Sequence, residues 1–372
     1  MKPYHQEISK VSSGIESFFS NTFSKIHVDG PPLNPEKIQQ NPFMAICTHR
    51  SHVDYFLLGH ELFKMGFENL RFAAGDNLTK LPYIGKRFKS FGAFTVARDN
   101  GFERNYVRNL CSSVVQMMED RDLIIVFPEG GRSYSGATLE MKGGILGAAI
   151  ILQAKNPEVD VYYLPAAISY ERLPDLPYFK MLLKGKKLRK KSNFLFKRFF
   201  GNLLYFGGDI LAFGPFMSAH RLNRKYGDVY IDYAEPISIR SIIDVQANRL
   251  EGTRDEFSAH RASMQQLSQI IYNQLKSLYR LLPMHVLSSV LDEHKPISTQ
   301  DARERVGKLV DYIQKKTYNL KQISKLDNAQ IVEQGIVQLS RFNSITSAHG
   351  IITVKKPEII NYYKASIDNT GE

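Results

Sequence analysis

The chain has 372 residues, of which 43% are hydrophobic and 23% charged, which is typical of a folded globular protein and unlike a disordered chain. Its formal charge of +12 and pI of about 9.4 indicate a surface that attracts phosphate, on nucleic acid, anionic lipid or an acidic carrier. Two cysteines exclude a disulfide framework and favour a reducing compartment. The N-terminal residues lack the apolar core of a signal peptide, and no apolar window of about 18 residues predicts a membrane span.

Apolar residues at helical spacing predict an N-terminal helix, and a Pro-containing linker completes a first segment, 1–40. From there to residue 240, predicted strands and helices alternate: strands at 43–49, 71–75, 92–98, 122–133, 160–169 and 227–239, helices at 55–66, 105–120 and 142–155. This alternation favours an α/β domain over 41–240, with a central, mostly parallel mixed sheet flanked by helices. Helical patterns dominate 241–372 and predict a helical C-terminal region.

The stretch "CTHRSHVDYFLLG" (47–59) places two histidines and an aspartate between a predicted strand and a predicted helix. His49 and Asp54 are five residues apart, which is too far round to share one face of a regular helix. A turn can nevertheless bring them together, so that the carboxylate orients the imidazole and leaves its other nitrogen as a general base. The alternative is that Asp54 or Ser51 only caps the helix. We expect His52 to be structural or substrate-facing, and Cys47 to be a buried strand residue.

Three further predicted strands also end in polar or glycine residues. These residues are Arg98, then Glu129, Gly130, Gly131 and Arg132, and finally Pro165 and Tyr170. Ligands of α/β sheets bind beyond the carboxyl ends of strands, where glycines let backbone N–H groups approach an anion and arginine binds phosphate. Taken alone, each arginine could instead be a solvated charge or part of a structural ion pair.

Taken together, these stretches resemble the glycerol-3-phosphate acyltransferase family of the glycerolipid acyltransferases. Four family blocks occur in order, as "HRSHVDYF", "GAFTVARD", "FPEGGRSYSG" and "LPAAISYERL". "GDVYIDYAEPISI" is similar to the family strand that follows, and "INYYKASI" to a motif of the bacterial membrane-associated enzymes. The resemblance covers about residues 40–240 closely and the C-terminal part loosely, and it implies a glycerolipid acyltransferase-like fold.

The resemblance implies that a fatty acyl group moves from a thioester, acyl-CoA or acyl carrier protein, to the sn-1 hydroxyl of glycerol 3-phosphate. His49 would be the base and Asp54 its orienter, without a metal or other cofactor. The substrate-binding residues would be Arg98, Glu129, Gly130, Gly131, Arg132 and Pro165. Block three combines features of lysophosphatidate and glycerol-3-phosphate enzymes, which leaves lysophosphatidate and dihydroxyacetone phosphate as alternative acceptors.

Residues 184–198 carry eight Lys or Arg and no acidic residue, interleaved with Leu and Phe. This pattern favours peripheral binding to an anionic membrane on its cytoplasmic face, through Lys186, Lys187, Arg189, Lys190 and Lys191. It would also suit RNA, an acyl carrier protein or a solvated loop, but no nucleic-acid motif is present. A basic lipid-binding protein on an acyltransferase-like scaffold is the non-enzymatic alternative. A hydrolase is a third, and the absence of a "GxSxG" pattern disfavours it.

Overall fold

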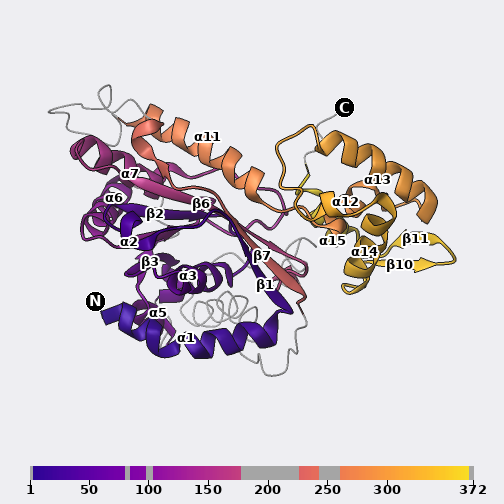
Figure 1. The fold of residues 1–372 in the computed structure, drawn as a ribbon, viewed down its shortest axis with the longest axis horizontal. Coiled ribbons are helices and arrows are strands. Elements are labelled where there is room, and N and C mark those ends of the chain that lie inside the picture. Colours follow the sequence, from indigo (N-terminus) through magenta and orange to yellow (C-terminus); the bar gives the residue numbers. More distant parts are fainter. Residues whose placement is uncertain (1–2, 80–83, 98–103, 177–225, 243–259, 368–372) are drawn as a thin grey trace, which may run out of the picture.

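A computed structural model describes residues 3–79, 84–97, 104–176, 226–242 and 260–367 of the chain (Figure 1). At its centre is an eight-stranded sheet in the order β1-β7-β6-β2-β5-β3-β4, with β8 paired to β6. Neighbouring strands are parallel except that β6 is antiparallel to β7 and β8, so the sheet is mixed but mostly parallel. The strands are β1 (Lys25–Asp29), β2 (Phe43–Cys47), β3 (Leu70–Gly75), β4 (Ala93–Val96), β5 (Leu123–Val126), β6 (Tyr162–Tyr170), β7 (Asp228–Tyr233) and β8 (Ile237–Ser238).

Helices cover both faces of this sheet, which explains why its central strands are continuous apolar runs. Every residue of β2 and β5 is buried, as expected for strands that lie between two layers of helices. Ala45 of β2 packs into one core with α1 and α3, whereas Met44 and Ile46 pack into a second core with α6, α7 and α11. The helices are α1 (Pro3–Thr22), α2 (Pro35–Ile38), α3 (Asp54–Lys64), α4 (Asp76–Thr79), α5 (Ile84–Ser90), α6 (Arg104–Glu119), α7 (Gly143–Lys155) and α11 (Arg261–Leu278). The predicted fold class is confirmed.

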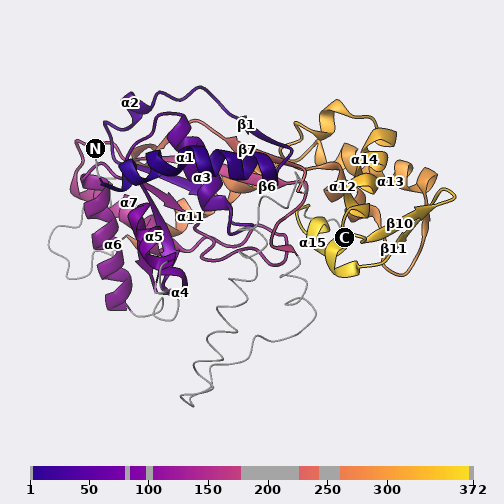
Figure 2. The same ribbon diagram turned by 90° about the horizontal axis from the view of Figure 1, so that it is seen from below.

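The C-terminal region forms a separate lobe at one end of the molecule (Figures 1 and 2). Its helical character was predicted, but its small antiparallel sheet, in the order β10-β11-β9, was not. The lobe comprises α12 (Pro283–Val290), β9 (Ile297–Ser298), α13 (Thr299–Ile313), α14 (Asn328–Ser340), β10 (Ile345–Ala348), β11 (Ile351–Val354) and α15 (Pro357–Lys364), with short 3-10 turns at Ile239–Ser241 and Ile323–Lys325. The boundary at residue 240 stays a prediction. Helix α11, beyond it, packs on α7 and the sheet rather than within this lobe.

Strand β1 lies in the segment that was predicted to be only a helix and a linker. It pairs in parallel with β7, about 200 residues further along the chain, and forms one edge of the sheet. Its five residues are exposed or half-buried, so they show none of the apolar run of a central strand. Of the helices that the structure describes, none has both the length and the apolar character needed to cross a bilayer.

Candidate active site

Three parallel or adjoining strands end side by side and bring the predicted site residues together. Strand β2 lies between β5 and β6 and is parallel to both. The segments that follow these strands therefore leave the same edge of the sheet, as expected for a ligand site of an α/β domain. His49 follows β2, Glu129 follows β5, and Tyr170 is the last residue of β6.

His49 and Asp54 form the pair that the spacing predicted. His49 Nδ1 lies 2.9 Å from Asp54 Oδ2, and the two side chains are 13% and 0% exposed. A carboxylate only accepts hydrogen bonds, so the proton of the neutral ring lies on Nδ1 and Nε2 keeps the lone pair. The helix-cap alternative does not fit, because Val53 is the N-cap of α3 and makes no side-chain cap bond. Ser51 Oγ accepts a bond from the Val53 N–H at 3.2 Å, in the turn before the helix.

Asp54 is held by three donors besides His49. The backbone N–H groups of Arg50 and Ser51 donate to Oδ2 at 2.6 Å and 2.8 Å, and the Tyr170 hydroxyl donates to Oδ1 at 2.5 Å. Burial, followed by the charge of Asp54, raises the pKa of Tyr170 far above its ordinary value, so the hydroxyl stays protonated and continues to donate. The carboxylate therefore has a fixed position relative to the His49 ring.

Glu129 holds the backbone of His49 through a hydrogen bond. Its carboxylate accepts the backbone N–H of His49 at 2.9 Å and that of Leu139 at 3.0 Å. The side chain is only 2% exposed, and the Phe127 ring lies 4.5 Å from the His49 ring, measured between centroids. In this arrangement Glu129 holds the protein backbone; the substrate-binding role predicted for it stays a prediction.

The two glycines after Glu129 have different surroundings. Gly130 has φ +69, and a Cβ there would lie 2.7 Å from Nζ of Lys142, so the lysine side chain lies along its backbone. At Gly131 a Cβ would meet nothing within 4 Å. Lys142, an exposed residue just before α7, was not predicted as a site residue. A lysine ahead of two glycines and an apolar helix is the sequence signal that could have found it.

Arg132 is buried in an ion pair instead of lying open at the surface. Its Nη1 donates to Asp175 at 2.6 Å, and the two side chains are 2% and 3% exposed. Asp175 also accepts the hydroxyl of Ser51 and, at 3.1 Å, the backbone N–H of His52. Asp175 thus joins the segments after β2, β5 and β6, although sequence reasoning missed it. Its partners Ser51 and Arg132 are 124 and 43 residues away along the chain, so no local pattern reports the contact.

Two family models match the chain, over two separate stretches. The Acyltransferase model matches residues 33–169, and the model of the glycerol-3-phosphate acyltransferase C-terminal region matches residues 213–364. The chain belongs to the glycerol-3-phosphate acyltransferase family. The first match contains the His49–Asp54 pair with Arg98 and the run from Glu129 to Arg132, and the second ends within α15.

Curated relatives carry the family's name. The chain is 27% identical over 294 residues to a glycerol-3-phosphate acyltransferase of Xylella fastidiosa strain M12, a match that covers 76% of this chain and 32% of the relative. It is 23% identical over 332 residues to a glycerol-3-phosphate acyltransferase of Alteromonas mediterranea, covering 87% of this chain and 38% of the relative. The chain therefore spans about a third of the length of the relatives it matches. A crystal structure of the 1-acyl-sn-glycerophosphate (LPA) acyltransferase PlsC from Thermotoga maritima aligns with a TM-score of 0.36 at 17% identity, covering 73% of this chain and 83% of that one.

For some of the predicted residues the structure gives no position in the site. Arg98 and the basic residues Lys186, Lys187, Arg189, Lys190 and Lys191 lie outside the described residues. Pro165 is a buried residue within β6, paired with Ile46 of β2, and its carbonyl accepts the N–H of Ala234 at 3.1 Å. It shapes the sheet beneath the site and lies before the strand exit.

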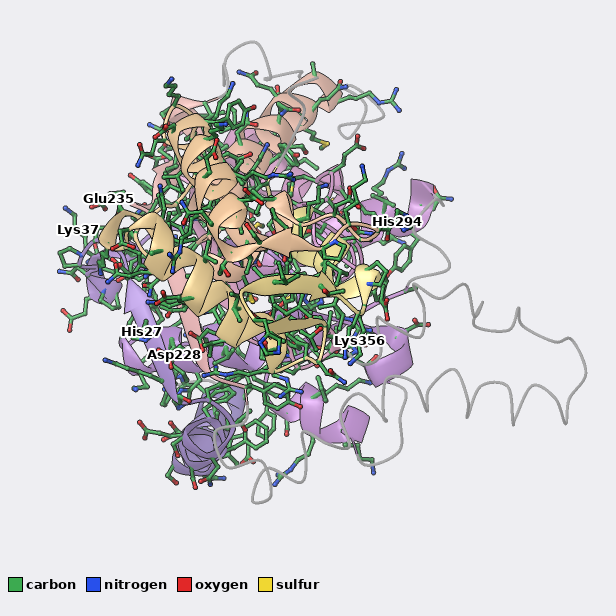
Figure 3. All side chains as sticks on the ribbon, turned by 90° about the vertical axis from the view of Figure 1, so that its right-hand side faces the viewer. His27, Lys37, Asp228, Glu235, His294 and Lys356 are labelled. Atoms are coloured by element: carbon green, nitrogen blue, oxygen red, sulfur yellow. The ribbon has the colours of Figure 1, made fainter. Side chains whose placement is uncertain are left out.

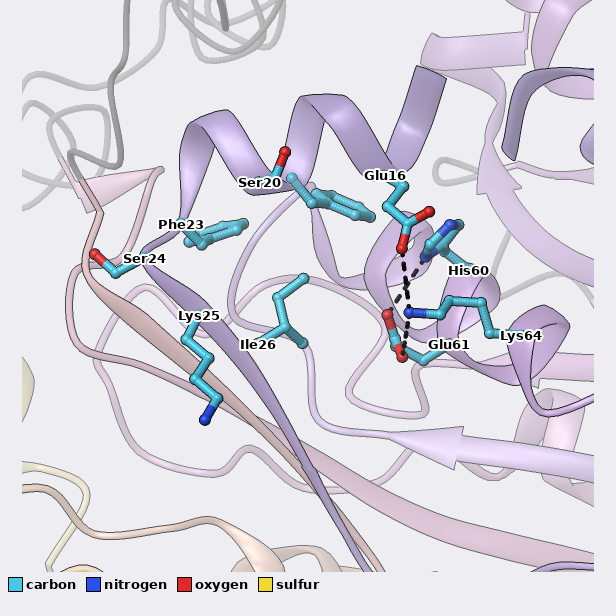
Figure 4. Close-up of a pocket in the computed structure, with 10 residues that line it drawn as sticks. Glu16, Ser20, Phe23, Ser24, Lys25, Ile26, His60, Glu61 and Lys64 are labelled. Carbon is cyan, nitrogen blue, oxygen red and sulfur yellow. Dashed lines mark hydrogen bonds and ion pairs between the residues drawn. The ribbon is translucent and has the colours of Figure 1, made fainter. Parts of the chain in front are cut away.

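A cavity of about 230 Å³ lies away from the four family blocks, between α1, β1 and α3 (Figure 4). Its polar side chains face one another: Lys64 Nζ lies 3.5 Å from Glu16 Oε1 and 4.0 Å from Glu61 Oε2. None of the predicted site residues lines it. Within the described part of the chain, no group of three or more His, Cys, Asp or Glu could hold a metal ion.

Proposed function

We propose that this protein is an O-acyltransferase that moves a fatty acyl group from a thioester to the sn-1 hydroxyl of glycerol 3-phosphate. The products would be lysophosphatidate, for phospholipid synthesis, and a free thiol. The observation that carries this proposal is the His49–Asp54 pair at 2.9 Å, with a fully buried carboxylate fixed by three further donors. Membership of the glycerol-3-phosphate acyltransferase family supports the same chemistry.

The base acts on the acceptor alcohol. Nε2 of His49 takes the proton of the hydroxyl while its oxygen attacks the thioester carbonyl, and a tetrahedral intermediate forms. When the intermediate collapses, the carbon–sulfur bond breaks and the thiolate receives the proton back from the imidazolium. Asp54 stabilises that imidazolium, and the donors around Asp54 keep the carboxylate from turning away. The oxyanion of the intermediate requires N–H donors.

The acceptor phosphate needs cations close to the base. We assign this role to Lys142 together with the family arginines Arg98 and Arg132. Lys142 lies along Gly130, next to the Glu129 that holds His49. Its backbone N–H donates to the Pro128 carbonyl at 2.7 Å, which anchors the side chain at this point. Arg132 is oriented by its ion pair with Asp175, which neutralises part of its charge.

The thioester is a co-substrate, acyl-CoA or acyl carrier protein, and the mechanism uses no cofactor. Peripheral binding to the cytoplasmic face of an anionic membrane would leave the product at the lipid surface. The basic run at 186–191 supports this placement. Replacing Lys186, Lys187, Arg189, Lys190 and Lys191 with glutamine should reduce sedimentation with vesicles that contain anionic lipid, and unchanged sedimentation would contradict this site.

In the deciding experiment, the purified protein is mixed with a labelled acyl donor, which is either acyl-CoA or acylated acyl carrier protein. Glycerol 3-phosphate, dihydroxyacetone phosphate and lysophosphatidate are supplied as acceptors in parallel reactions. We expect the fastest transfer to glycerol 3-phosphate and no transfer by His49→Ala, which should still fold because His49 lies in a loop beyond β2. Transfer by His49→Ala at the wild-type rate would rule out the mechanism. Vesicle binding without transfer to any acceptor would favour the lipid-binding alternative. Release of free fatty acid regardless of acceptor would favour a hydrolase.

A further inference from the structure

Arg50, the residue after the proposed base, has a completely buried side chain. Its Nη1 donates to the carbonyl of Ala137 at 2.6 Å and its Nη2 to Thr138 Oγ1 at 3.2 Å. The guanidinium also lies 4.7 Å from the centre of the Tyr279 ring. A buried charge is costly unless it is well paired, so this arginine holds its partners in fixed places. It connects the catalytic segment both to the loop of residues 133–139 and to the residue that follows α11.

Gly136 brings the same 133–139 loop into contact with α15. It has φ +90, and a Cβ there would overlap the carbonyl oxygen of Tyr362. Only glycine allows this approach, because any side chain would meet helix backbone that cannot move aside. The Ser366 hydroxyl donates to the Gly136 carbonyl at 3.2 Å. The C-terminal motif "INYYKASI" thus lies directly on a loop of the active-site domain.

The 133–139 loop in turn fixes the backbone of His49 on both sides. The Ser133 N–H donates to the His49 carbonyl at 2.9 Å, and the Ser133 hydroxyl donates to the Ala137 carbonyl at 2.6 Å. At the other end of the loop, the Leu139 N–H donates to Glu129, whose second oxygen accepts the His49 N–H. A displacement of the loop would therefore move both polar groups of the His49 backbone.

We propose that the C-terminal region positions the catalytic base, with Tyr279, Tyr362 and Ser366 holding Arg50 and the 133–139 loop against His49. These are positioning residues, since they act on His49 through Arg50 and the loop. The proposal rests on the proposed acyl transfer for its kinetic consequence, but the physical contact can be measured without it. A shift of about 1 Å in a catalytic group costs about a hundredfold in rate. Loosening the contact should therefore lower kcat and leave KM for the acceptor nearly unchanged.

The test compares Gly136→Ala with Gly350→Ala. Both glycines have positive φ, so both substitutions strain the backbone. Gly350 lies in the turn between β10 and β11, where an added Cβ would meet only Thr299 Oγ1, at 3.6 Å. Tyr279→Leu is a second variant, which removes the ring beneath Arg50 and keeps a buried apolar residue. Two measurements are made on each protein. The first gives kcat and KM with glycerol 3-phosphate and acyl-CoA or acyl carrier protein. The second gives amide hydrogen exchange over residues 133–139.

We expect kcat to fall about tenfold to a hundredfold in Gly136→Ala and Tyr279→Leu, with KM within about threefold and faster exchange in the loop. Gly350→Ala should match the wild type in both measurements. Unchanged kcat, or a rise in KM alone, would overturn the proposal, as would an equal loss in Gly350→Ala. If the wild-type protein transfers no acyl group, the proposed function fails; loop exchange still decides whether the C-terminal region holds the loop. Unchanged exchange in both variants would overturn that contact.

Discussion

Two histidine–aspartate pairs with nearly the same separation lie among the residues that the structure describes. His49 Nδ1 is 2.9 Å from Asp54, and His27 Nε2 is 2.8 Å from Asp228, where β1 meets β7 (Figure 3). Both lie toward the same edge of the sheet, because β7 runs opposite to β6 and Val229 at its start pairs with Tyr170 at the end of β6. Therefore neither the distance between the two side chains nor the end of the sheet at which they lie distinguishes a catalytic base from a surface ion pair.

The aspartates differ in what holds them. The Asp54 side chain is 0% exposed and has three further donors, whereas the side chains of His27 and Asp228 are 30% and 28% exposed. His27 also stacks on Tyr230, with centroids 4.7 Å apart, which covers one face of its ring. Water screens the exposed pair and competes with its hydrogen bond. A fixed, dry carboxylate is what makes the first pair suitable for catalysis.

Asp54→Asn should have the largest effect on activity. The amide can donate to the histidine and so stabilise the wrong tautomer, with the lone pair on Nδ1, and it also faces the N–H groups of Arg50 and Ser51. We expect kcat to fall about 10³–10⁴-fold. Steady-state kinetics measure this, with circular dichroism as the control for folding. A variant that keeps a tenth of the wild-type kcat would show that the carboxylate is dispensable.

Tyr170→Phe tests the hold on Asp54 alone. The change removes the 2.5 Å bond to Oδ1 and leaves the His49–Asp54 contact intact. We expect kcat to fall about tenfold, the effect of one hydrogen bond to a charged group. An unchanged rate would show that the two backbone donors are enough to hold the carboxylate.

Lys142→Met leaves both histidine–aspartate pairs intact and separates binding from proton transfer. Without the cation beside Gly130, KM for glycerol 3-phosphate should rise about tenfold while kcat stays within about twofold. Lys142→Arg should restore most of the affinity. If KM is unchanged and kcat falls instead, the lysine acts on the reaction and not on the phosphate.

The comparison extends to a third histidine, His285, whose ring contacts the Leu282 N–H and the Tyr279 hydroxyl instead of a carboxylate. Burial and the charge of Arg50 lower its pKa from 6.5 to about 3. The unfolded chain therefore takes up a proton below pH 6.5 that the folded chain rejects, and stability present above pH 6.5 is lost as the pH falls toward 3. The loss is about 2 kcal/mol by pH 5. Urea unfolding of His285→Gln should show a smaller decrease between pH 7.5 and 5; an equal decrease would assign the acid sensitivity to other groups.

Asp228→Asn should have the smallest effect. Its partner His27 lies on an edge strand and neither residue contacts the His49 loop, so kcat and KM should stay within about twofold of the wild type. A loss comparable to that of Asp54→Asn would mean that the exposed pair takes part in the reaction and that burial of the aspartate is not the deciding property.

The sequence predicted the parts that depend on local pattern. Apolar runs and helical periodicity located the sheet and most helices, and strand ends pointed to His49, Asp54 and the Glu129–Arg132 turn. Asp175 and the buried position of Arg50 were missed, because each depends on contacts between distant segments. Strand β1 was missed for the same reason: its five residues become a strand only by pairing with β7. The ion pair between Arg132 and Asp175 also could not be predicted from the local sequence around either residue. Lys142 was missed although a local pattern, a lysine ahead of two glycines and an apolar helix, marks it.

The burial of Cys47 and Cys111 has a practical consequence. These are the only two cysteines of the chain, they are 0% and 1% exposed, and burial raises the pKa of both thiols, that of Cys111 to about 12. Since thiolates are the reactive form, a maleimide at neutral pH should leave the native protein unlabelled. A cysteine introduced at Gly131, where an added Cβ has open space, would then be the single attachment point for a fluorophore. Such a dye would test whether the acceptor binds in this turn, as the proposed function requires.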